Sequence, residues 1–170
     1  MKLHSIRIET NRELISPLSR RSLLMAAAAV VGLPAWAVTS TKPGPGLVEV
    51  WKSPSCGCCK DWVKHVEANG FKVKLHDEGN TDARVRLGMP IRYGSCHTAL
   101  VDGYVLEGHV PAREIRRLLK DKPRALGLAV PAMPVGSPGM DGPEYGGRKD
   151  PYDVLIVRKN GASAVFQPYR

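Results

Sequence analysis

The pattern of hydrophobic and polar positions predicts alternating strands and helices over most of the chain. Continuous apolar runs and segments that alternate apolar with polar side chains are typical of strands, while apolar side chains three and four residues apart are typical of helices. The expected strands are residues 47–51, 71–76, 98–101 and 104–107, and the expected helices are residues 58 or 59 to 69, 81–87 and 112–120. Asp102-Gly103 separates the last two strands and predicts a hairpin turn between them.

The pattern changes after the last of these helices. Residues 125–145 are rich in Pro, Gly and Met and have no periodicity, which predicts a long irregular segment of the kind that often carries function in compact domains. Residues 152–157 and 164–169 are expected strands that flank Lys159-Asn160-Gly161. They predict a second hairpin that extends the sheet.

The expected elements follow the order β-α-β-(α)-β-β-α, and the second hairpin comes after them. This order predicts an α/β protein: a thioredoxin-like domain with an additional C-terminal β-hairpin. In that fold the connection into the third strand lies beside the turn between the first strand and the first helix. Residues 56–59 and 96–97 occupy these two places, so we expect them to meet in space by analogy with the fold.

The first 37 residues have the features of an export signal. Ser19-Arg20-Arg21-Ser22-Leu23-Leu24 resembles the twin-arginine motif, and Ala35-Trp36-Ala37 has the small-x-small pattern of a signal-peptidase site. The apolar run at 23–33 is about half the length that spans a bilayer, so no stable membrane anchor is predicted. We expect a periplasmic protein with a twin-arginine-type signal peptide at 1–37, a linker at 38–46 and one domain at 47–170.

The chain is basic, with a formal net charge of +9 at pH 7. A basic balance can indicate a nucleic-acid partner, but the sequence has no block of Lys and Arg with interleaved aromatic residues. The basic stretch at residues 113–124 alternates charged with apolar side chains, and we interpret it as the solvated face of a helix. Nucleic acid is therefore not an expected partner.

The four cysteines form two groups, both after the predicted signal. Cys56, Cys58 and Cys59 lie within four consecutive residues, and Cys96 stands alone. Because the bacterial periplasm is kept oxidising, clustered thiols there are expected to be paired, catalytic or metal-bound. The frame Cys56-x-x-Cys59 at the start of a helix suits a dithiol redox pair, since a helix N-terminus favours the thiolate. The extra Cys58 inside this frame favours metal binding.

The donor types narrow the choice of metal. Zinc is satisfied by three cysteines and one histidine, and four thiols with one or two histidines exceed that need. Surplus thiolates can bridge several Cu(I) ions, and the tight spacing is uncommon for iron–sulfur ligation. Copper is favoured by the softness of the donors. A thiol–disulfide oxidoreductase that uses Cys56 and Cys59, and a zinc-binding structural module, are the alternatives.

Two histidines and two methionines are further candidate ligands. His109 lies in the loop Gly108-His109-Val110-Pro111, where a ligand and a surface or helix-capping histidine are both plausible roles. His97 directly follows a cysteine and is a weaker candidate. Met133 and Met140 lie in the Pro/Gly segment. Thioether sulfur binds Cu(I) in soft sites, although a Met more often fills a gap in packing, so both are weaker candidates.

Four motifs are long enough to compare with known families: Lys52-Ser53-Pro54-Ser55-Cys56-Gly57-Cys58-Cys59; Ser95-Cys96-His97-Thr98; Asp102-Gly103-Tyr104-Val105-Leu106-Glu107-Gly108-His109-Val110-Pro111; and Gly127-Leu128-Ala129-Val130-Pro131 with Met133-Pro134-x-Gly136-Ser137-Pro138-Gly139-Met140. Together they resemble the CopG-type copper-resistance proteins, which are small exported metal-binding proteins. The resemblance covers residues 47–169. One position departs from the family pattern, because Ala132 stands where the family usually has Gly.

The resemblance implies a thioredoxin-like domain that binds a multinuclear Cu(I) cluster. The implied thiolate ligands are Cys56, Cys58, Cys59 and Cys96, with His109 as a further ligand and His97 as a less certain one. The implied task is copper detoxification in the cell envelope with cycling between Cu(I) and Cu(II), which is the activity of a copper-dependent oxidoreductase. The implied partners are copper ions and other copper-handling proteins of the envelope.

Overall fold

The computed structural model describes residues 46–170, so the predicted signal peptide and most of the predicted linker lie outside the described residues. The strands are β1 (Leu47–Lys52), β2 (Lys72–His76), β3 (His97–Val101), β4 (Tyr104–Glu107), β5 (Gly127–Ala129), β6 (Tyr152–Val157) and β7 (Ser163–Tyr169). The helices are α1 (Gly57–Ala68), α2 (Thr81–Arg86) and α3 (Ala112–Asp121), with short 3-10 helices η1 (Ile91–Tyr93) and η2 (Pro143–Tyr145).

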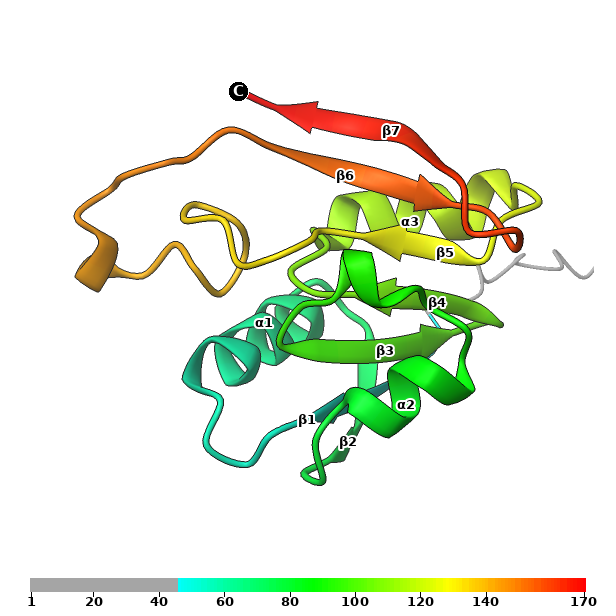
Figure 1. The fold of residues 1–170 in the computed structure, drawn as a ribbon. Helices are drawn as coiled ribbons and strands as arrows, with labels where there is room; N and C mark the ends of the chain where they lie inside the picture. The colour runs from blue at the N-terminus through cyan, green and yellow to red at the C-terminus, as the bar shows by residue number, and fades with distance from the viewer. Residues whose placement is uncertain (1–45) are drawn as a thin grey trace, which may run out of the picture. The chain divides into compact units, whose positions relative to one another are not determined.

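The strands form one mixed sheet in the order β2-β1-β3-β4-β5-β6-β7 (Figure 1). β1 pairs with β2 in parallel through the crossover helix α1, and β4 pairs with β5 in parallel through α3. The other neighbours are antiparallel. The predicted α/β class is confirmed, and the C-terminal hairpin β6–β7 extends the sheet as the sequence predicted.

Helices cover both faces of the sheet. On one face the apolar stripes of α1 and α3, which include Trp62 and Ile115, pack with strand residues such as Leu106. Because successive strand residues point to opposite faces, Val105 belongs to a smaller cluster on the other face, which also contains Met89. Figure 1 shows α2 on the opposite side of the sheet from α3.

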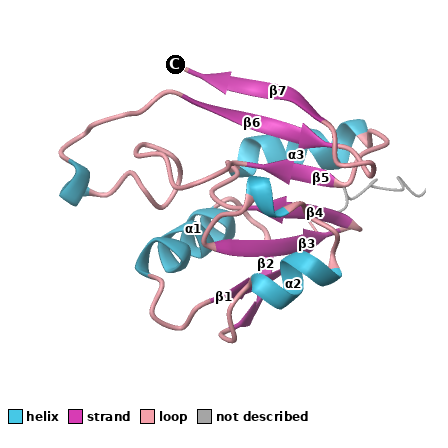
Figure 2. Cartoon of the chain, in the orientation of Figure 1, coloured by secondary structure: helices cyan, strands magenta, loops and turns pink. Residues whose placement is uncertain are grey.

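β5 lies inside the segment that the sequence predicted to be irregular, and the prediction was wrong for these residues. β5 pairs with β4 on one side and β6 on the other, so it joins the two hairpins into one sheet. A Cβ atom on Gly127 would lie 1.7 Å from the carbonyl oxygen of Val105, so only glycine permits this approach. A strand this short is not visible as an alternating pattern. Residues 130–151 are loop apart from η2, as Figure 2 shows.

The strand directions bring four connections to one end of the sheet. β1 and β4 end there, β3 begins there because it is antiparallel to both, and β5 ends there because it is parallel to β4. These connections carry the first cysteine group, Cys96, His109 and the long loop after β5. Segments that are distant in the sequence therefore meet at this end.

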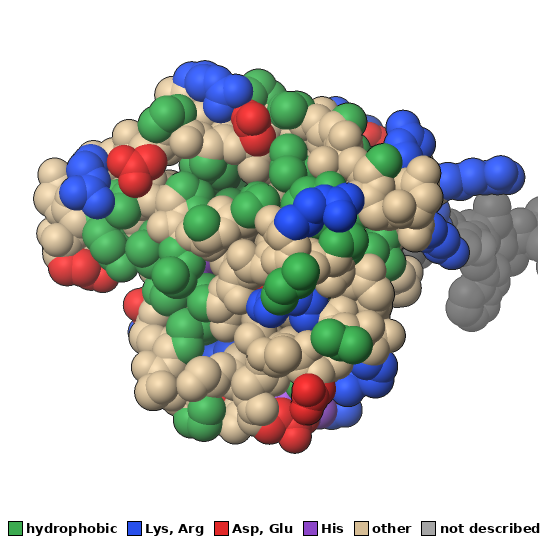
Figure 3. Space-filling view, viewed as in Figure 1, with side chains coloured by type: hydrophobic (Ala, Val, Ile, Leu, Met, Phe, Trp, Pro, Cys, Tyr) green, Lys and Arg blue, Asp and Glu red, His purple; other side chains and the backbone are tan. Residues whose placement is uncertain are grey.

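No helix within residues 46–170 is long and apolar enough to cross a membrane. On the face shown in Figure 3, Lys and Arg side chains occupy several separate places, and hydrophobic side chains lie among them.

Candidate metal centre

The first cysteine group occupies the turn between β1 and α1. Cys56 is the residue before the first helical residue, and its N–H donates to the carbonyl oxygen of Ser53 at 3.1 Å. Cys56 and Cys59 form a disulfide across the first turn of the helix, with their Cα atoms 5.4 Å apart. Cys58 is a partly exposed free thiol, whereas Cys59 is fully buried. The two cysteines of the predicted dithiol frame are thus within bonding reach of each other.

Cys96, on the connection into β3, faces this turn. Its sulfur lies 3.9 Å from Cys58 Sγ, and Cys58 Sγ lies 3.5 Å from Cys56 Sγ. The Cys96 carbonyl oxygen is 3.5 Å from Cys59 Sγ. All four sulfurs lie within 4.8 Å of one another. We call these four residues the sulfur group.

His109 lies on the other side of Cys96, with its Nε2 atom 3.0 Å from Cys96 Sγ. Its Nδ1 atom is 2.7 Å from the carbonyl oxygen of Pro138. A carbonyl can only accept, so Nδ1 carries the proton and the lone pair of Nε2 faces the sulfur. Proteins commonly orient a metal-ligating histidine by such a bond from its other nitrogen.

His97 is fully buried beside these residues. Its Nδ1 atom lies 3.5 Å from Cys96 Sγ, and its ring packs on Trp62 with the ring centroids 4.2 Å apart. Its Nε2 atom has no hydrogen-bond partner among the described residues. The donor atoms of Cys96, His97 and His109 lie within 4.8 Å of one another, and we call these three residues the mixed group.

Burial determines the protonation of these donors. It lowers the pKa of His109, and it lowers the pKa of His97 well below the usual value, with a further contribution from the neighbouring His109. Burial, together with Cys58, raises the pKa of Cys96 to about 12. At neutral pH both imidazoles are therefore uncharged and able to bind a metal, whereas the Cys96 thiol keeps its proton. Metal binding at Cys96 would release that proton.

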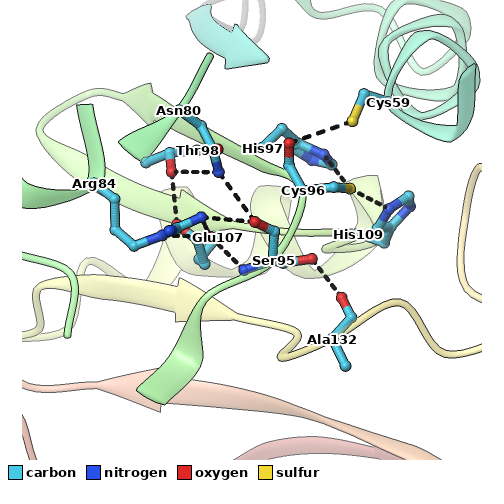
Figure 4. A network of polar contacts seen from close by, with 10 residues as sticks. All are labelled: Cys59, Asn80, Arg84, Ser95, Cys96, His97, Thr98, Glu107, His109 and Ala132. Carbon is cyan, nitrogen blue, oxygen red and sulfur yellow. Dashed lines mark hydrogen bonds and ion pairs between the residues drawn. The ribbon is translucent and has the colours of Figure 1, made fainter. Parts of the chain in front are cut away.

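A buried ionic network fixes the backbone of Ser95, the residue before Cys96, as Figure 4 shows. Glu107 accepts hydrogen bonds from the Ser95 N–H at 2.7 Å, from Thr98 Oγ1 at 2.7 Å and from Arg84 Nε at 3.0 Å. Arg84 also donates to the Ser95 carbonyl oxygen at 2.6 Å. Burial raises the pKa of Glu107, while the three donors act in the opposite direction. Both backbone groups of Ser95 are thus fixed, and the position of the next residue is fixed with them.

The long loop after β5 packs against the first turn of α1. A Cβ atom on Gly139 would lie 2.6 Å from the carbonyl oxygen of Cys58 and 2.7 Å from the backbone nitrogen of Trp62. Gly139 has a φ of 83°, a conformation that favours glycine. This close approach brings the neighbouring Pro138 carbonyl to His109. The irregular segment therefore has a definite role in orienting a candidate ligand.

The two methionines have other surroundings. Met133 is half exposed in a surface groove that it lines together with Pro131 and Tyr152. Met140 Sδ accepts a hydrogen bond from the Tyr145 hydroxyl at 3.3 Å. The structure thus brings together the six Cys and His candidates, and the two methionines stay predictions from the sequence.

Sequence reasoning missed the residues that support the site. In the sequence, Arg84 is only part of a short predicted helix, and Glu107 is only the end of a predicted strand. The signal was present in Val105-Leu106-Glu107, because a carboxylate that continues an apolar run into a buried strand needs a cationic partner. The sequence does not say which of its many Arg and Lys residues supplies the partner.

The chain is similar to one protein-family model and to two solved structures. Residues 93–140 match a family model described as a protein of unknown function, DUF411. A solved structure of copper resistance protein CopG, form 2, is 47% identical, with 74% of this chain and 99% of that chain covered and a TM-score of 0.68. Form 1 of that protein is 48% identical, with 74% and 98% covered and a TM-score of 0.67. No curated protein sequence matches significantly.

The fold and the site define a class of protein: a small α/β domain with a thiol- and imidazole-rich group at one end of its sheet that could bind a soft metal. Within that class the level of identity over nearly the whole solved chain settles the relationship. The chain belongs to the CopG family of copper resistance proteins.

Proposed function

We propose that this chain is a periplasmic copper-binding protein of copper resistance, which binds Cu(I) in a multinuclear thiolate cluster. The observation that carries the proposal is that Cys96 belongs to both the sulfur group and the mixed group. A thiolate can bridge two ions, so a shared sulfur supports more than one metal position.

The distances support shared ligation. Cys58 and Cys96 sulfurs are 3.9 Å apart, which is less than two metal–sulfur bonds of about 2.3 Å each. One ion can therefore be held between them with small side-chain movements. His109 Nε2 lies 3.0 Å from Cys96 Sγ, close enough for both atoms to bind a second ion. Four thiolates are a donor set that favours Cu(I) over harder metals.

The fold supports the same proposal. The strand order β2-β1-β3-β4 with α1 after β1 and α3 after β4 is consistent with a thioredoxin-like domain, which we propose for residues 47–121 with the later strands as an addition. The family relationship supports a role in copper resistance. Other copper-handling proteins of the envelope are the proposed partners, and cycling between Cu(I) and Cu(II) is the proposed redox activity.

Metal analysis after anaerobic purification of the reduced protein from copper-grown cells tests the proposal. We expect more than one copper per chain, and loss of most of it in Cys96→Ser because that sulfur serves both groups. His76→Gln is the matched control, because His76 pairs with Glu49 away from both groups and its replacement should leave the copper content unchanged. Less than one copper per chain, with zinc or iron in its place, would contradict the proposal.

One observation favours a second candidate, a thiol–disulfide oxidoreductase. The Cys56–Cys59 disulfide spans the first turn of α1, where a dithiol catalyst would have it. The variant Cys58→Ser with Cys96→Ser separates the two functions. An oxidoreductase keeps its dithiol activity in this variant, whereas a copper cluster loses most of its metal.

A further inference from the structure

The two donor groups depend differently on the Cys56–Cys59 disulfide. A thiolate is the form of cysteine that binds metal, and the two sulfurs of a disulfide have no thiolate. In the disulfide form the sulfur group is therefore reduced to Cys58 and Cys96. The mixed group contains neither bonded cysteine, so all three of its donors persist.

The mixed group is built for a metal even in the disulfide form. Cys96 Sγ lies 3.0 Å from His109 Nε2 and 3.5 Å from His97 Nδ1. His109 is held in the ligating tautomer by Pro138. His97 is fully buried, and its remaining ring nitrogen has no partner among the residues from 46 to 170. No described side chain competes with an ion for the two imidazoles.

The donor chemistry of the two groups is also different. One thiolate with two imidazoles suits divalent ions of borderline softness, such as Cu(II) and Zn(II), whereas several thiolates suit Cu(I). The two groups share Cys96, so the state of the disulfide changes both the number of metal positions and the kind of ion that is preferred.

We infer that the disulfide selects the metal. The disulfide form binds one divalent ion at Cys96, His97 and His109, and opening of the disulfide adds the sulfur group, which binds Cu(I). This inference rests on the proposed function, since it assigns the copper of the reduced form to the cysteines. Opening by an external dithiol transfers two electrons and two protons: the Cys56–Cys59 bond breaks, two thiols form, and the external dithiol becomes a disulfide.

Titration of the full chain in the disulfide form with Co(II) tests the inference. Co(II) stands in for Zn(II), does not oxidise thiols as Cu(II) does, and gives a thiolate charge-transfer band. Thiol counting first establishes that two free thiols are present. We expect one Co(II) per chain with that band and a rise in the thermal midpoint of unfolding.

Two matched variants identify the ligands, because Cys58 and Cys96 are both free thiols with sulfurs only 3.9 Å apart. Cys58→Ser should weaken the binding of Co(II) by the disulfide form less than Cys96→Ser does, and it should keep the charge-transfer band. Cys96→Ser should abolish the band. His109→Gln should weaken binding by at least about tenfold, and it provides a second test if Cys96→Ser does not fold.

The outcomes separate this inference from the proposed function. A disulfide form that takes no Co(II), or that loses it as fully in Cys58→Ser as in Cys96→Ser, overturns the inference. If the reduced protein still takes up Cu(I) in that case, the proposed function stands. Failure of the reduced protein to take up Cu(I) overturns the proposed function, while binding of Co(II) by the disulfide form still shows the metal site at the mixed group.

Discussion

Ala132 adopts a left-handed backbone conformation, with a φ of 60°. An L-residue with a Cβ atom is disfavoured in this region by about 1–2 kcal/mol, whereas glycine adopts it without a steric cost. At this position the resemblance to the CopG-type proteins predicts glycine. The conformation explains why glycine suits it, and the carbonyl oxygen of Ala132 accepts a hydrogen bond from Ser95 Oγ beside the candidate site.

Replacement of Ala132 by Gly is therefore expected to stabilise the protein. The gain in the free energy of unfolding should be about 1 kcal/mol or less, because relief of the backbone strain is partly offset by the greater freedom of glycine in the unfolded chain. Urea denaturation measures the change. Ala162→Gly, at an exposed loop position that is not left-handed, is the control and should destabilise slightly. A loss of stability in Ala132→Gly would contradict the argument.

The buried histidines predict how stability depends on pH. Burial lowers the pKa of both His97 and His109 in the folded protein, so the unfolded chain binds protons near pH 6.5 that the folded protein does not. The free energy of unfolding should therefore fall as the pH decreases through 6.5, by up to about 1.4 kcal/mol per pH unit for each histidine. Above this pH neither the unfolded chain nor the folded protein binds these protons, so the two histidines no longer make the free energy of unfolding depend on pH.

Denaturation of the metal-free disulfide form between pH 7.5 and 5.5 measures this dependence. His109→Gln removes one of three histidines whose pKa burial lowers, the third being the partly buried His65, and should give a shallower slope. Equal stability at both ends of the range would show that the two imidazoles gain no proton on unfolding.

At the scale of elements, the loop after β5 controls the site through its contact with α1. Gly139→Ala should weaken metal binding, because the new Cβ atom would lie 2.6 Å from the carbonyl oxygen of Cys58 and the loop would have to move away from His109. Gly147→Ala is a matched control, because Gly147 has a similar φ of 74° but nothing lies within 4 Å of the added atom.

Both glycine variants should lose about 1–2 kcal/mol from the left-handed backbone, and only Gly139→Ala should lose more than this and also lose metal affinity. Urea denaturation and metal titration of the two variants measure the difference. Equal metal affinity in both would mean that the loop does not orient His109.

The connection between α2 and β4 is a second support. Arg84→Met would leave the Glu107 carboxylate buried without its cation, at a cost of about 3–5 kcal/mol in the free energy of unfolding. Replacement of both residues by apolar ones should cost less, since no charge stays buried. Arg148→Met, which breaks an exposed pair with Asp150, should cost less than about 1 kcal/mol. A double-mutant cycle in urea tests this, and additive effects of the two core changes would contradict coupling.

At the scale of the whole molecule, the order of the elements was predictable because each has its own local signal. β4 and β7 each follow a turn sequence, and α1 ends near Gly70, which has a φ of 84°. β5 was not predictable, because its place depends on how closely two backbones approach at Gly127. A local sequence pattern indicates the environment of a residue within its own helix or strand. It carries no information on the contacts of that residue with other elements.

The same distinction applies to the site. The cysteines were visible as donors because packing alone rarely places three thiols within four consecutive residues. The tautomer of His109 depends on the carbonyl of Pro138, 29 residues further along the chain, and no local pattern shows it. The pairing of Arg84 with Glu107 was hidden for the same reason, since 23 residues separate them.

If residues 1–37 are a signal peptide, the exported protein should begin near Val38. N-terminal sequencing of periplasmic material measures this, and replacement of Arg20 and Arg21 by Lys should retain the precursor in the cell. Exported material that still begins with Met1 would contradict the prediction.

The meeting of four connections at one end of the sheet has a consequence for the order of events during synthesis. The donors follow β1, precede β3 and follow β4, and the carbonyl that orients His109 follows β5. No partly made chain that stops before β5 can contain the finished site, although all the thiols have already emerged by then. A growing chain should therefore bind metal with native affinity only once it extends through Gly139. A series of chains truncated from the C-terminus would show affinity appearing in one step.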